Sequence, residues 1–156
     1  MGHDEARFVD LAGPHPLGGS ANVFVRRRAV MKRGLLLFAH GARDPRWAEP
    51  FEAVAQRVRQ RDPALTVQLA FLDFMAPTLR EAGELLVAAG CARVDVLPLF
   101  LGAGGHVRKD LPELLAELRA AHAGTAWHLR RAIGEAGSVI DAMADAALRL
   151  TSEPAP

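Results

Sequence analysis

Two histidines and an aspartate stand where predicted strands would bring them to one edge of a sheet. His40 follows an apolar run and precedes Gly41, Asp73 ends a second run, and His106 follows the glycine-rich stretch 102–105. Imidazole titrates near neutral pH and is the commonest protein ligand of divalent first-row metals, which also accept carboxylates. These residue types predict a metal site with open coordination positions, from which the ion can also be released.

Each residue also has an ordinary structural explanation. A lone histidine at a strand end is usually hydrogen-bonded into the fold, and an aspartate there often caps the next turn. The glycine-rich stretch could cradle a phosphate, because glycines let backbone N–H groups approach an anion. Neither the P-loop spacing nor the dinucleotide-binding spacing is present, however. Two histidines at corresponding strand ends, each beside a glycine, favour the metal site.

The segments that must position these residues alternate between short apolar runs and helical patterns. This alternation is typical of βαβ units with a parallel sheet. The apolar runs predict four strands, over residues 35–40, 66–73, 94–101 and 127–133. We expect an α/β, flavodoxin-like, three-layer αβα domain with a four-stranded, mainly parallel sheet. In the strand order 2-1-3-4, the first and third strands are neighbours, and both histidines would face one crevice.

Helical patterns lie between and after the predicted strands. The first helix has Pro50 in its first turn, where proline is tolerated, and Gly90 closes the second. Asp110, with Glu113 three positions later, predicts the start of the third helix. Pro98 is discordant with a fully paired central strand, because it lacks a backbone N–H.

The composition indicates one globular domain in a reducing compartment. The chain has 156 residues, half of them apolar, and a net charge of +1, which argues against nucleic-acid binding through bulk charge. The single cysteine excludes an intrachain disulfide and a thiolate zinc cage. No apolar stretch approaches the ~20 residues of a membrane span, and the opening segment lacks a signal-peptide core. We expect a cytoplasmic protein without nucleic-acid or membrane partners.

Three regions are predicted along the chain. Residues 1–30 contain irregularly spaced glycines and prolines and a basic cluster, and are expected to form a flexible N-terminal extension. Residues 31–150 are expected to form the single domain. Residues 151–156 are expected to be a frayed tail.

Three motifs resemble those of the sirohydrochlorin chelatases of the CbiX/SirB type. They are HGARD at 40–44, FLD at 71–73 and LPLFLGAGGHVRKDLP at 97–112. The first is weak alone, but the third is long and specific, and their order and separation agree with the family. The resemblance covers about residues 34–150.

The resemblance implies a class II chelatase, a lyase that inserts a divalent metal into a tetrapyrrole in cobalamin or siroheme biosynthesis. The metal, cobalt, iron or nickel, is a substrate, and no organic cofactor is expected. The family's two metal-binding and catalytic histidines map onto His40 and His106, and its strand-end acid onto Asp73. The family usually has Ser where this chain has Ala42, and it often has Glu where this chain has Asp73. An aspartate carboxylate reaches less far than a glutamate carboxylate, which argues against Asp73 as a direct metal ligand. Short members form homodimers, so a homodimer is expected.

Sirohydrochlorin carries many carboxylates, so its site needs basic donors. Arg43 and Arg108 are the preferred pair among the basic residues beside the histidines, because Arg binds carboxylates bidentately. Phe100 and Leu101 are candidates for apolar walls against a planar ligand. Two other interpretations remain open: a nickel or cobalt carrier that does not catalyse insertion, and a flavodoxin-like interaction domain without activity.

Overall fold

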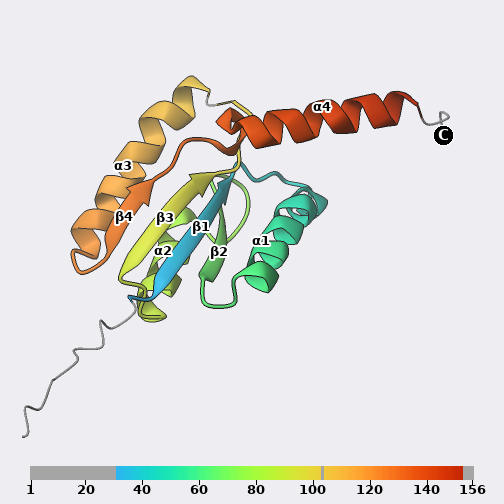
Figure 1. The fold of residues 1–156 in the computed structure, drawn as a ribbon. Helices are drawn as coiled ribbons and strands as arrows, with labels where there is room; N and C mark the ends of the chain where they lie inside the picture. Colours follow the sequence, from blue (N-terminus) through green and yellow to red (C-terminus); the bar gives the residue numbers. More distant parts are fainter. Residues whose placement is uncertain (1–30, 103, 153–156) are drawn as a thin grey trace, which may run out of the picture.

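A four-stranded sheet forms the centre of the domain (Figure 1). The computed structural model describes residues 31–102 and 104–152, so the predicted extension at 1–30 and the end of the predicted tail lie outside the described residues. Every strand pair is parallel and the order is β2-β1-β3-β4, which confirms the predicted architecture and strand order. The strands are β1 (Arg33–Ala39), β2 (Thr66–Phe71), β3 (Arg93–Pro98) and β4 (Ala126–Leu129).

Side chains of the central strand β1 are buried on both faces of the sheet. Leu36 and Phe38 point into one core, and Leu37 and Ala39 point into the other. This arrangement explains the continuous apolar run of β1, because a parallel strand covered on both faces needs apolar residues at successive positions.

Helices α2 (Leu79–Ala88) and α3 (Gly105–Ala121) cover one face, and α1 (Glu49–Arg61) covers part of the other. The first core contains Leu86 of α2 and Leu115 of α3, both fully buried, together with Trp127 of β4. The second core is smaller and includes Ala55 of α1. The three predicted layers are therefore present, but the two faces of the sheet are covered unequally.

The last helix, α4 (Gly137–Thr151), extends away from the sheet (Figure 1). It follows the short 3-10 helix η2 (Ile133–Glu135) and has no buried residue. Thr151 is the last residue of this helix. None of the helices in the described residues is long and apolar enough to cross a membrane.

Two helix signals in the sequence are confirmed and one is wrong. Pro50 lies in the first turn of α1, and Gly90 follows α2 with φ +81°. Asp110 does not begin α3, since that helix starts at Gly105 after the N-cap Gly104. A capping pattern favours the start of a helix at that residue, but the helix can begin earlier. Inside the continuing helix α3, a backbone carbonyl accepts the N–H of Asp110.

The strands end one to four residues earlier than predicted. After β3 the reason is that Leu99 and Phe100 continue to pack into the two cores although the backbone has left the sheet. Pro98 is compatible with an interior strand because its missing N–H faces a side on which no pairing is lost. Leu99 donates its N–H to Phe38 on the β1 side, so the missing N–H of Pro98 faces the β4 side. There the pairing already ends with Val96 opposite Leu129.

The turns that follow β1 and β2 are bonded to each other. The N–H of Leu72 donates to the carbonyl of Ala39, and the N–H of Asp73 donates to that of His40, both at 2.9 Å. Gly41 has φ +81°, and a Cβ there would collide with the carbonyl oxygen of Asp73. Glycine at this position therefore lets the two strand ends approach.

We predict that Gly41→Ala lowers the free energy of unfolding by about 2 kcal/mol or more, because it adds a collision to the left-handed backbone cost. Gly90→Ala is the matched control: its φ is also +81°, but a Cβ there would meet no atom within 4 Å. It should cost only about 1 kcal/mol. Urea unfolding of both variants measures the difference, and equal losses would contradict the close approach of the two turns.

Candidate functional site

His40 is the first residue after β1 and lies exposed at the carboxyl edge of the sheet. Its ring packs on Phe100, with ring centroids 4.4 Å apart and planes at 47°. Phe100 is almost fully buried and packs edge-on against Phe38 in the first core, at 5.9 Å. The imidazole therefore lies against an anchored aromatic ring from the segment that follows β3.

Asp73 lies beside His40 through the backbone hydrogen bond described above, and its side chain is exposed. This position supports a role near the imidazole. Among the described residues, however, no three His, Cys, Asp or Glu side chains are grouped closely enough to hold a metal ion. The predicted three-residue set therefore depends on His106.

His106 and Arg108 lie in the first turns of α3, and their side chains are outside the described part of the structure. Their backbone position agrees with the topological prediction. α3 begins after β3, β3 pairs with β1, and the carboxyl ends of parallel strands meet at one edge. The assignment of both residues to the site remains a prediction.

Two arginines near His40 have different partners. The guanidinium of Arg43 lies 5.4 Å from the ring centroid of Phe74, a cation–π contact. Arg46 instead forms a 2.7 Å ion pair with Asp44, the N-cap of the 3-10 helix η1 (Pro45–Ala48). The hydrogen bonds from Arg46 lower the pKa of Asp44, and those to Asp44 raise the pKa of Arg46. Arg43 is thus better placed to meet a ligand carboxylate.

Phe74 is an aromatic residue that the sequence did not single out. It is 69 % exposed, directly follows Asp73 and has a φ of 63°, which is uncommon for a residue other than glycine. An exposed aromatic ring in such a conformation at a strand end is a candidate ligand contact. Its apolar neighbours in sequence gave no sign that its ring would be exposed.

An open apolar cleft of about 760 Å³ ends at His40. Its floor is formed by side chains of β1 and β3, and one wall by η1 and α1, including the half-exposed Trp47. Phe100 and Leu101, predicted as apolar walls, both line it. Among the described residues that line the cleft, His40 is the only titratable one. The cleft is therefore suited to a large apolar surface, with its chemistry at one end.

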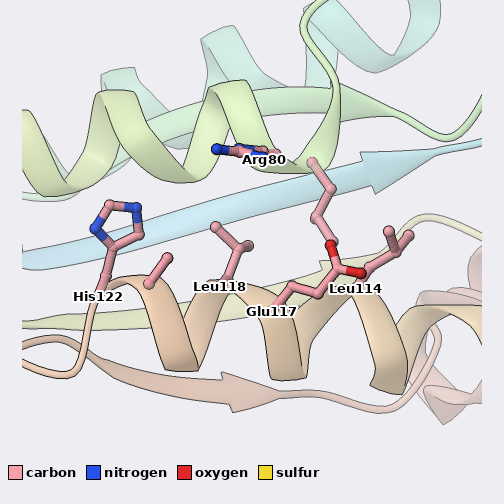
Figure 2. A pocket seen from close by; sticks show the side chains of 7 residues that line it. Arg80, Leu114, Glu117, Leu118 and His122 are labelled. Atoms are coloured by element: carbon pink, nitrogen blue, oxygen red, sulfur yellow. The ribbon is translucent and has the colours of Figure 1, made fainter.

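A second hollow lies between α2 and α3, beside the other face of the sheet (Figure 2). It is lined by Arg80 of α2 and by Glu117 and His122 at the α3 side, with apolar residues between them. Its volume is only about 100 Å³, and Arg80 is already paired with Glu84 at 3.0 Å. This hollow is too small for a macrocycle, so it is not a competing site for such a ligand.

Curated relatives of this chain are sirohydrochlorin cobaltochelatases. The one from Methanocaldococcus jannaschii is 32% identical over 88 residues, covering 56% of this chain and 62% of the relative. The one from Saccharolobus solfataricus is 37% identical over 82 residues, covering 53% of this chain and 62% of the relative. The chain thus spans about three fifths of the length of these relatives.

Solved structures share the fold. A putative cobalamin biosynthesis CbiX protein from Marinobacter aquaeolei has a TM-score of 0.68 and 30% identity, over 77% of this chain and 98% of that chain. The sirohydrochlorin chelatase SirB from Bacillus subtilis, in complex with cobalt, has a TM-score of 0.66 and 24% identity, over 74% of this chain and 49% of that one. The sequence model of the CbiX family matches residues 34–150. This chain therefore belongs to the CbiX family.

Proposed function

We propose that this protein inserts cobalt or iron into sirohydrochlorin or a related tetrapyrrole, in cobalamin or siroheme biosynthesis. The observation that carries the proposal is the position of His40 at the end of a large apolar cleft, on the edge where α3 and His106 begin. Family membership and the names of the curated relatives support it. SirB from Bacillus subtilis has been solved with cobalt and with Fe³⁺, the two metals of this proposal.

Metal insertion requires the ion to lose water, meet one face of the macrocycle and displace two pyrrole protons. In our proposal the imidazoles of His40 and His106 first hold the ion. As a pyrrole nitrogen replaces each imidazole on the ion, the freed imidazole nitrogen accepts the pyrrole proton, because the same lone pair can serve first as metal ligand and then as base. Asp73, whose backbone is bonded to that of His40, orients an imidazole by accepting its N–H or relays a proton, in keeping with the shorter reach of aspartate. Moderate metal affinity suits the reaction, since a closed four-ligand cage would compete with the product.

The tetrapyrrole is bound by groups around this edge. Arg43 and Arg108 bind its carboxylates, and the apolar cleft side chains and Phe74 contact its planar surface. We further propose that the protein is a cytoplasmic homodimer. The homodimer is an expectation from the family resemblance, and a two-fold arrangement would bring two clefts together.

We predict that His40→Ala lowers the rate of cobalt insertion roughly 100-fold or more, because the variant loses a metal ligand and a proton acceptor. His106→Ala should have a similar effect, and both variants should keep the circular dichroism spectrum of the parent. The visible absorbance of sirohydrochlorin reports the reaction.

His122→Ala is the control, because His122 caps α3 beside the hollow in Figure 2, away from the cleft. Near-normal insertion by either site variant would contradict the assignment. Tight cobalt binding by the parent without acceleration over the spontaneous rate would instead identify a metal carrier.

We predict that Arg43→Ala raises the KM for sirohydrochlorin about tenfold with little change in kcat, since a carboxylate contact binds ground state and transition state alike. Arg46→Ala is matched in type and position, but removes a guanidinium that is paired with Asp44. It should leave KM within about twofold. Steady-state kinetics at saturating cobalt measures both values, and equal effects of the two variants would remove Arg43 from the substrate site.

A further inference from the structure

Phe74 lies at the centre of a tight turn between β2 and α2. The N–H of Met75 donates to the carbonyl of Asp73 at 2.8 Å, which closes a three-residue turn of the γ type around Phe74 and its φ of 63°. A γ-turn with positive φ is rare and strained, and a bulky side chain at its centre is an outlier. The chain therefore has an aromatic residue where glycine would cost less backbone strain.

The packing of the domain does not account for this aromatic side chain. Phe74 is 69 % exposed and belongs to neither hydrophobic core. Its ring therefore gains little from burial that could offset the strained backbone. Strained residues that packing does not explain are typical of sites that bind or act on a ligand.

The turn is held beside the end of β1. The N–H of Asp73 donates to the carbonyl of His40, and the carbonyl of Asp73 lies so close to Gly41 that no Cβ would fit there. On the other side, Thr78 begins α2 as the N-cap of a capping box. The backbone of Phe74 is thus held from both sides at a fixed place next to His40.

Arg43 reaches the ring of Phe74 from the loop after β1. Its guanidinium carbon lies over this ring, 5.4 Å from the centroid, and none of the ion pairs among the described residues involves Arg43. When a planar guanidinium lies over an aromatic ring, the N–H donors at its edge remain available for a carboxylate. The contact also restricts a long side chain before the ligand arrives, so binding loses less conformational entropy.

We propose that Phe74 is a positioning residue of the substrate site, whose ring holds the guanidinium of Arg43 in the orientation that binds a carboxylate of the tetrapyrrole. Phe74 acts here through Arg43, beyond its own apolar contact with the macrocycle. Because the turn is fixed next to His40, the pair holds the carboxylate-bearing rim of the ligand beside the site of metal insertion. The inference deepens the proposed function and rests on its assignment of Arg43 to a substrate carboxylate.

The first test is the Kd of metal-free sirohydrochlorin, measured by equilibrium dialysis of the full chain without cobalt. Phe74→Leu should raise this Kd about threefold, because leucine keeps an apolar contact but loses the attraction to the guanidinium. Phe74→Trp should bind at least as tightly as the parent, since tryptophan makes the strongest cation–π contact. Weaker binding by the tryptophan variant than by the leucine variant would contradict the proposal.

A double-mutant cycle separates positioning from an independent contact. In the Arg43→Ala background, Phe74→Leu should leave the Kd almost unchanged, because the guanidinium that the ring holds is absent. Arg46→Ala is the matched background: Arg46 is paired with Asp44, so Phe74→Leu should again raise the Kd about threefold. The same effect of Phe74→Leu in both backgrounds would overturn the proposal.

Stability measurements distinguish positioning from a purely structural role. Phe74→Gly relieves the strained backbone and removes a ring that neither core buries, so its urea midpoint should equal or exceed that of the parent. Its Kd for sirohydrochlorin should nevertheless rise at least about threefold. A clear fall in the midpoint would show that Phe74 serves the fold, which would overturn the proposal.

None of these measurements requires metal insertion. A parent that binds sirohydrochlorin but does not accelerate cobalt insertion would contradict the proposed chelatase function alone. A double-mutant cycle without coupling, in a parent that does insert cobalt, would contradict the role of Phe74 alone.

Discussion

The parallel pairing of β1 with both β2 and β3 is the constraint on which the rest of the structure depends. It aligns Phe38 with Ala70 on one side and with Pro98 on the other, so three strands end at one edge. This alignment brings His40, Asp73 and the start of α3 to the same edge of the sheet, since each of them follows the end of a paired strand. The hydrogen bond between the backbones of Asp73 and His40 then fixes two of these ends together.

The two faces of the sheet serve different purposes. The face under α2 and α3 holds the larger core, including fully buried Leu36, Leu86 and Leu115, and contributes most of the packing that holds the strands in place. The opposite face leaves an open cleft that leads to His40. Incomplete packing there costs stability, because apolar side chains remain in contact with water. A large apolar ligand that packs on this floor would reduce that cost.

The sequence predicted the architecture well, because the apolar runs of β1 to β3 and the helical spacing in α1 are strong local signals. Strand ends were less predictable, since Phe100 remains buried two residues after β3 has ended. The early start of α3 at Gly105 was missed because Asp110 and Glu113 carry a capping pattern inside the helix. The sequence gives the pattern of α4 but not the direction in which it leaves η2, which depends on contacts with the Phe100 segment.

The candidate site was predictable only in part. The type and order of His40, Asp73 and His106 follow from motifs, and the sheet topology brings the end of β1, the end of β2 and the start of α3 to one edge. The exposed ring of Phe74 and the Arg43 contact could not be predicted, because they arise from the backbone conformation of a turn. The ion pair between Arg46 and Asp44 could not be predicted either, and it is in keeping with the preference for Arg43 over Arg46 as a substrate contact.

The central claim is that the imidazoles of His40, after β1, and His106, at the start of α3, share one metal ion. X-ray absorption spectroscopy at the cobalt edge, on the protein loaded with Co²⁺, counts the imidazole ligands directly. The account predicts two imidazoles per ion in the parent and one in the His40→Ala variant. A cobalt spectrum without imidazole scattering, or one that is unchanged when His40 is removed, would contradict it.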